Sequence, residues 1–229
     1  MENEKKVRKG EIKFNISLSG EQREAKQLIL ANDITLLRGS AGSGKSLLAC
    51  QCALDGFFKG EYSKIIIARP AVSAGEDIGF LPGSEKEKIM GYLLPIFDNL
   101  MALYGDTKAK RDKIQKHIDE NEIEICSVGK LRGRTFSNAF VIIDEFQNVT
   151  KPQAYLITTR LGINSRMVVT GDLKQSDIRG YNGLEKLISM SKRIDGIVDI
   201  ELKMNHRKGI VKRIIEEWDN EEDNDNTNR

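Results

Sequence analysis

The stretch Gly39-Ser40-Ala41-Gly42-Ser43-Gly44-Lys45-Ser46 decides the fold of this chain. Its G-x-x-x-x-G-K-S spacing is that of a phosphate-binding P-loop. Glycines can take positive φ, which lets backbone N–H groups converge on phosphate oxygens. We expect Lys45 to reach the β- and γ-phosphates and the Ser46 hydroxyl to ligate Mg²⁺. The stretch therefore predicts a nucleotide-binding site that runs from Gly39 to Leu47.

The segments on either side of this stretch support the same prediction. Residues 34–37 are apolar and favour a strand, whereas residues 47–50 are apolar and can continue as a helix. The N-terminus of a helix favours bound anions. A glycine- and serine-rich turn could match the spacing by chance, but a strand before it and a helix after it argue against that reading.

Strand and helix patterns alternate along the rest of the chain. Strands are expected at residues 34–37, 64–68, 123–126, 139–143, 167–170 and 197–200. Helices are expected at residues 19–31, from the P-loop to about 58, and at 106–120, 152–161, 184–193 and 208–218. A helical apolar pattern also covers residues 89–101, where Pro95 should kink the helix or start a second one. This alternation predicts an α/β fold with a mostly parallel sheet flanked by helices on both faces.

Composition limits the broad class of the protein. Its 229 residues are 39% hydrophobic and 31% charged, which is ordinary for one globular domain. The net charge of +2 is too balanced to indicate a nucleic-acid partner by itself. Three cysteines without metal-ligand spacing indicate reduced thiols and a cytoplasmic protein. Residues 1–9 are charged and no apolar run approaches membrane-spanning length, so we expect neither a signal peptide nor a membrane span.

Two carboxylates follow the apolar strand pattern at residues 139–143. In a parallel sheet the ligand lies beyond the carboxyl ends of the strands. Asp144 would therefore meet the Mg²⁺ held by Ser46, through a water molecule. Glu145 would activate the attacking water as a general base. Two solvated carboxylates at a strand end are common in isolation, but beside a P-loop they predict Mg²⁺-dependent hydrolysis of a nucleoside triphosphate.

Two glutamines are candidates for the ends of the nucleotide. Gln175 follows the strand pattern at residues 167–170 and could hydrogen-bond the γ-phosphate or the attacking water, or belong to a plain polar turn. The carboxamide of Gln22 can pair with the amino group and ring nitrogen of adenine. It is equally well spaced to close a capping box on Ser19 at the start of a helix. The residues alone leave both alternatives open.

Arginines are candidates for the charge that develops on the γ-phosphate, since an arginine finger can offset it. Arg207, before the last predicted helix, is the candidate for this catalytic role. Arg132 and Arg134 lie in a loop and could touch phosphates of the nucleotide or of a nucleic acid. Arg160 could stabilise a helix end, and Arg69 follows a strand. Arg69, Arg132, Arg134 and Arg160 are together candidates for a nucleic-acid or subunit interface, although any of them could be a solvated surface charge.

The P-loop and several longer stretches together resemble the PhoH-like family of ATPases, which is similar to the motor cores of superfamily-one helicases. The stretches are ARPAVSAGEDIGFLPGSEKEK at residues 68–88, LRGRTFSNAFVIIDEFQNVT at 131–150, TTRLG at 158–162 and VVTGDLKQSD at 168–177. The resemblance covers residues 18 to about 217. It departs from the family pattern at Phe146 and at residues 90–91, and the segment 205–207 fits the family's final arginine motif only loosely.

The resemblance implies a RecA-like P-loop NTPase fold, ATP as the nucleotide, and a role with RNA or DNA. It also implies the hexameric rings that some members form. The opening at residues 19–22 looks like the adenine-reading motif of helicases, which favours the adenine contact for Gln22. We expect a flexible segment at residues 1–16, the PhoH-like domain at 17–218 and a disordered acidic tail at 219–229.

Three functions fit these residues. The leading prediction is a helicase-like motor core that hydrolyses ATP with Mg²⁺ on single-stranded RNA or DNA. Because the chain has room for one core, such a motor must form a homo-oligomer, with a neighbour's arginine reaching across each interface. The alternative is an ATP-gated binding switch with slow hydrolysis, which grips a nucleic acid or protein through residues 71–83, Arg132 and Arg134. A small-metabolite kinase is disfavoured by the carboxylate pair at residues 144–145.

Overall fold

The computed structural model describes residue 10 and residues 12–14, 16–70, 85–105, 107–207, 209–211, 213–214 and 217, without the side chains of 85–93. Residues 1–9, 11 and 15 of the segment predicted to be flexible at 1–16 lie outside these residues, as does the whole tail predicted to be disordered at 219–229. The loop at 71–83 and part of the helix expected at 208–218 also lie outside them. Ile12, Phe14 and Ile16 pack against the core, so contacts with the folded domain begin before residue 17.

One sheet of parallel strands forms the centre of the described chain. The six strands are β1 (Ile34–Gly39), β2 (Lys64–Arg69), β3 (Ile123–Ser127), β4 (Ala139–Ile143), β5 (Arg166–Gly171) and β6 (Ile197–Leu202). Their order is β3-β2-β4-β5-β1-β6, and every neighbouring pair is parallel. All six predicted strands are confirmed. Because the strands are parallel, the segments that follow them meet at one edge of the sheet.

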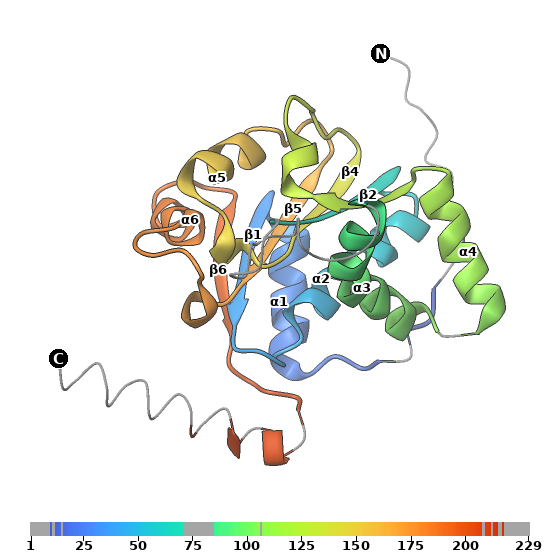
Figure 1. Cartoon of the computed structure of the whole chain (residues 1–229), viewed down its shortest axis with the longest axis horizontal. Coiled ribbons are helices and arrows are strands. Elements are labelled where there is room, and N and C mark those ends of the chain that lie inside the picture. The colour runs from blue at the N-terminus through green and yellow to red at the C-terminus, as the bar shows by residue number, and fades with distance from the viewer. Residues whose placement is uncertain are drawn as a thin grey trace.

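Helices cover both faces of the sheet, as predicted. Figure 1 shows α1 (Gly20–Ala31), α2 (Lys45–Phe58), α3 (Glu85–Tyr104) and α4 (Lys108–Asp119) on one face, with α5 (Lys151–Thr158) and α6 (Gly183–Ser191) on the other. The strands supply apolar side chains to both layers, because successive residues point to opposite faces. Leu37 and Ile65 belong to the core with α2, and Leu36 and Ile66 to the core with α6. Short 3-10 helices follow three strands: η2 (Val128–Leu131), η3 (Phe146–Asn148) and η4 (Leu173–Gln175).

The helix α3 excludes one of the two outcomes expected at Pro95. It continues past Pro95 to Tyr104, so no second helix begins at the proline, and the kink remains a prediction. Proline removes one backbone donor from a helix. The residues after it compensate through packing, since Leu100 and Leu103 are fully buried in the core. Tertiary contacts therefore decide the helix where the local signal favoured an interruption.

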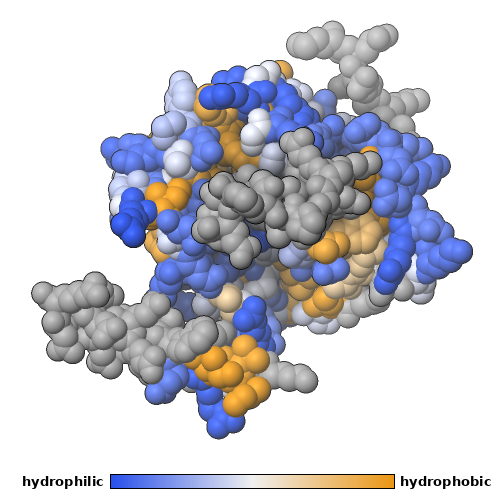
Figure 2. Space-filling view, viewed as in Figure 1, coloured by the Kyte–Doolittle hydropathy of each residue, from blue (hydrophilic) through white to orange (hydrophobic). Residues whose placement is uncertain are grey.

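One face of the molecule is mostly polar where its residues are described. Figure 2 shows a largely hydrophilic face, with apolar residues gathered over the C-terminal described segment. In that segment Ile210 and Ile214 are 56% and 48% exposed, and Met204 before it is 51% exposed. In the part of the chain that the structure describes, no helix combines the length and the apolar character needed to cross a membrane.

Candidate nucleotide-binding and active site

The P-loop lies between β1 and α2, at the carboxyl edge of the sheet, as predicted. Gly42 and Gly44 have φ of 88° and 83°, a left-handed conformation that favours glycine. A Cβ on Gly44 would approach Nε2 of Gln22 to 2.6 Å, so this position also needs the small residue for space. Ser43 is fully buried, and its hydroxyl donates to the Ser40 carbonyl at 2.9 Å. The loop is thus held in shape by its own hydrogen bonds.

Lys45 begins α2 and folds back over the P-loop. Its ammonium donates to the carbonyl oxygens of Gly39 at 2.6 Å and Ser40 at 2.9 Å. Burial lowers the pKa of this ammonium, while neighbouring carboxylates, Asp172 first among them, oppose the shift. The geometry keeps a cation at the centre of the loop, where it is able to exchange carbonyl partners for a phosphate.

Asp144 follows β4 and is joined to the P-loop across β5. The side chain of Asp144 is 7% exposed. Oδ1 accepts from the Ser46 hydroxyl at 2.7 Å and also from the Thr170 hydroxyl on β5. Oxygen atoms of this kind are the ligands that Mg²⁺ prefers, so Ser46 and Asp144 fit a hard cation. Sequence reasoning did not single out Thr170, although it is a polar residue inside an apolar strand.

Glu145 has an unusual backbone and a tightly held side chain. Its φ of 56° and ψ of 42° are left-handed, which is uncommon for a residue with a side chain and recurs at functional sites. Arg69 Nη2 lies 3.1 Å from Oε1, and Gln147 Nε2 donates to Oε2 at 2.6 Å. Arg69 Nε also lies 3.3 Å from an oxygen of Asp144. The structure therefore places Arg69 between the two carboxylates.

Gln147 is a site residue that sequence reasoning missed. Its side chain is 1% exposed and reaches three partners. Besides Glu145, Nε2 approaches the Gln175 carbonyl at 3.4 Å, and Oε1 accepts from the Asp172 N–H at 3.1 Å. Gln175 itself is exposed, and its carboxamide donates to Asp172 at 2.9 Å. Gln147 thus ties the carboxylate pair to the segment after β5, and the contact of Gln175 with a γ-phosphate remains a prediction.

Gln22 joins α1 to the P-loop. The capping box is present, because Oε1 accepts from the Ser19 N–H at 3.1 Å and the Ser19 hydroxyl accepts from the Gln22 N–H. Nε2 donates to the Ser43 carbonyl at 3.2 Å. The carboxamide therefore has protein partners on both of its ends. Its contact with adenine remains a prediction.

The segment after β6 lies across the P-loop and carries Arg207. The His206 N–H donates to the Gly42 carbonyl at 3.0 Å, and the Asn205 side chain donates to the Ala41 carbonyl at 3.2 Å. A Cβ on Gly42 would approach Arg207 Cγ to 2.6 Å, so the arginine rests directly on this glycine. Glu21 of α1 accepts backbone N–H groups at the start of the segment. Arg207 therefore lies beside the P-loop of its own chain.

The other three arginines have separate surroundings. Arg160 donates from Nε to the Leu156 carbonyl at 3.2 Å near the end of α5, which fits the helix-end interpretation. Arg134 pairs through both terminal nitrogens with Glu124 at 2.6 and 2.7 Å. Hydrogen bonds from Arg134 lower the pKa of Glu124 to about 2. Arg132 lines a pocket between η2 and α5.

The sequence of this chain is similar to those of known proteins. A family model described as PhoH-like protein matches residues 16–219. A PhoH-like protein of Bacillus subtilis is 42% identical over 202 residues, which cover 86% of this chain and 62% of that protein. A PhoH-like protein of Synechocystis is 37% identical over 221 residues, which cover 95% of this chain and 65% of that protein. The chain thus spans just under two thirds of these relatives.

A solved structure agrees with the fold. The Sulfolobus solfataricus SWI2/SNF2 ATPase core has a TM-score of 0.50 and 14% identity, over 83% of this chain and 46% of that one. This likeness concerns the fold alone, and with the parallel sheet it supports the predicted RecA-like α/β P-loop fold. Because the PhoH-like model matches most of the chain and relatives exceed 30% identity, the chain belongs to the PhoH-like protein family.

Proposed function

We propose that this chain binds ATP with Mg²⁺ at the P-loop, hydrolyses it, and couples hydrolysis to single-stranded RNA or DNA. The observation that carries the proposal is the junction of three elements at one point. Ser46 of α2 hydrogen-bonds Asp144 after β4, and the adjacent Glu145 is held by Arg69 of β2. A phosphate cradle, oxygen ligands and a positioned carboxylate are the parts that phosphoryl transfer to water requires.

Each residue has a distinct role in this proposal. Lys45 binds the β- and γ-phosphates after leaving its carbonyl partners. Ser46 and Asp144 would hold the Mg²⁺, which would supply positive charge against the phosphates. Glu145 accepts a proton from the attacking water, and Arg69 and Gln147 fix the direction of its carboxylate. Gln175 and Arg207 complete the site around the γ-phosphate.

The nucleic-acid part of the proposal is supported by two observations. The Sulfolobus protein of similar fold is an ATPase core in complex with dsDNA. In this chain, Arg132 is exposed on the same edge of the sheet as the P-loop. The free, buried cysteines agree with a cytoplasmic setting, because reduced thiols persist there.

Turnover in the presence of a nucleic acid tests the proposal. We expect phosphate release from ATP to need Mg²⁺ and to rise severalfold when single-stranded RNA or DNA is added. A double-stranded oligonucleotide measured in parallel shows whether the rise requires unpaired bases. Unchanged turnover with every oligonucleotide would favour the ATP-gated switch with slow hydrolysis. A wild-type protein that binds ATP but releases no phosphate under any of these conditions would contradict the ATPase itself.

We also propose that the chain assembles as a homo-oligomer, with a hexameric ring as the largest expected form. The exposed side chains of Met204, Ile210 and Ile214 support an interface near the C-terminal segment, since contiguous exposed apolar residues mark interaction sites. Measurement of mass in solution, with and without ATP and an oligonucleotide, gives the assembly state. A strictly monomeric protein with full turnover would contradict the assembly.

The position of Arg207 favours action within its own chain instead of across an interface. We expect Arg207→Ala to lower turnover roughly 100-fold, as loss of one transition-state donor does. We further expect no recovery when this variant is mixed with Lys45→Ala, because neither subunit then has a complete site. Recovery in the mixture would mean that a Lys45→Ala subunit donates its arginine to a neighbour, and the finger would then act across the interface.

A further inference from the structure

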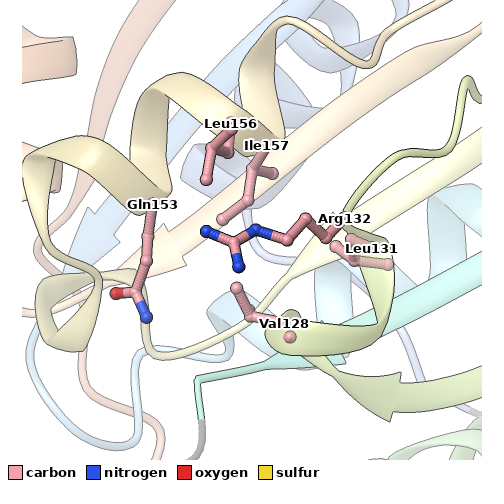
Figure 3. Close-up of a pocket in the computed structure, with 7 residues that line it drawn as sticks. Val128, Leu131, Arg132, Gln153, Leu156 and Ile157 are labelled. Carbon is pink, nitrogen blue, oxygen red and sulfur yellow. The ribbon is translucent and has the colours of Figure 1, made fainter.

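The pocket between η2 and α5 lies outside the nucleotide site. Val128, Leu131 and Ile157 form its apolar walls and are at most 6% exposed. Its volume is about 200 Å³, and Gly129, Arg132, Gln153 and Leu156 complete the lining. In Figure 3 the Arg132 side chain extends across the pocket toward Gln153. None of the described residues that line it is a carboxylate.

The neighbouring residues Arg132 and Arg134 differ in their contacts. Arg134 is committed to Glu124 through two hydrogen bonds, and it stacks over Phe136 at 5.6 Å. It therefore anchors the segment that follows η2. Arg132 is exposed and forms no hydrogen bond or ion pair with the described residues. Within the described part of the chain, the segment thus presents the unpaired guanidinium of Arg132 over an apolar cavity.

We infer that this pocket binds an unpaired nucleobase of a single-stranded nucleic acid, with the base stacked on the Arg132 guanidinium. The inference rests on the proposed function and names a subsite for its nucleic-acid partner. Guanidinium planes stack on splayed bases, and apolar walls favour their faces. Lys130, exposed on η2, offers a second cation for the adjoining phosphates. A cavity lined by a planar cation and apolar side chains, without a carboxylate, matches a flat base attached to an anionic backbone.

The walls of the pocket continue directly into the nucleotide site. Ser127, which precedes η2, is the register partner of Arg69 on the neighbouring strand. On the other side, η3 leads from Glu145 into α5. Arg69 and Glu145 are themselves in contact at 3.1 Å. A base bound between η2 and α5 would therefore contact elements that are connected to both Arg69 and Glu145. Movement of these elements could change the ion pair, and this is a physical route by which the oligonucleotide raises ATP turnover.

Two single strands that differ only in their bases test whether the pocket binds a nucleobase. The probes are a labelled short oligothymidylate and an abasic strand with the same number of phosphates, measured by fluorescence anisotropy at one salt concentration. We expect wild type to bind the base-containing strand more tightly. We expect Arg132→Lys, which keeps the charge and loses the plane, to lower this preference roughly tenfold. Its affinity for the abasic strand should stay unchanged, and its stimulation by oligothymidylate should fall.

Arg193→Lys is the matched control, because Arg193 is an exposed arginine beyond the end of α6 and does not line the pocket. An unchanged preference in Arg132→Lys would overturn the pocket while leaving the ATPase and its stimulation in place. Equal binding of both strands by wild type would also overturn it. A wild type that binds neither strand would remove the nucleic-acid partner and the pocket together, and ATP turnover measured separately would show whether the hydrolysis itself stands.

Discussion

Lys45→Ala is expected to abolish nucleotide turnover, with a fall of at least roughly 1000-fold. The ammonium is a half-buried cation beside the P-loop carbonyls, and its partial burial lowers its pKa. Its removal leaves the phosphate charge without a partner in a site of low dielectric. It also frees the Gly39 and Ser40 carbonyls that it now holds. Binding of a fluorescent ATP analogue and phosphate release measure the two consequences separately.

A control is needed because the loop could simply lose its shape. Lys26→Ala removes a lysine of α1 that pairs with Asp55 at 3.1 Å, away from the P-loop. We expect this control to keep turnover, and both variants to keep cooperative thermal unfolding. Near-normal phosphate release by Lys45→Ala would mean that the nucleotide is not held at this loop.

The parts of the fold that depend on local sequence were predictable. Apolar β-branched segments predicted all six strands. The spacing of the glycines and of Lys45 predicted the P-loop, because these residues interact within a few positions of one another. The capping box at Ser19 and Gln22 was equally local. What it left open was the direction of the Gln22 carboxamide, which depends on α1 lying against the Ser43 carbonyl.

The parts of the site that depend on strand order were not predictable. Thr170 reaches Asp144 because β5 lies on one side of β4. Arg69 reaches Glu145 because β2 lies on the other side of β4. Strand order is not encoded by any short pattern, so these contacts appear only in three dimensions. The same reason hid Gln147, which needs the segment after β5 to be near. Arg132 and Arg134 are two residues apart and look equivalent in the sequence. Their contacts differ because Glu124 forms hydrogen bonds with Arg134.

Glu145→Gln is expected to keep nucleotide binding and to lower hydrolysis roughly 100- to 10,000-fold, the range that a general base contributes. The amide has nearly the shape of the carboxylate but cannot accept the proton of the attacking water. The left-handed backbone is compatible with glutamine as it is with glutamate, so the P-loop contacts should persist. Binding of a fluorescent ATP analogue should then match wild type, while phosphate release in a single turnover falls.

The hydrogen-bond donors around Glu145 make a second variant necessary. Both oxygens now face donors, Nη2 of Arg69 and Nε2 of Gln147. A glutamine at position 145 offers one oxygen, so one donor loses its acceptor and the local hydrogen bonds must shift. Gln147→Leu separates the two effects, since it removes the positioning amide and keeps the base. We expect it to slow hydrolysis less than Glu145→Gln, whereas Glu120→Gln, a change at an exposed residue just after the end of α4, should leave turnover intact. Retained turnover in Glu145→Gln would remove Glu145 as the base and would leave the attacking water to be activated by another group at this edge of the sheet.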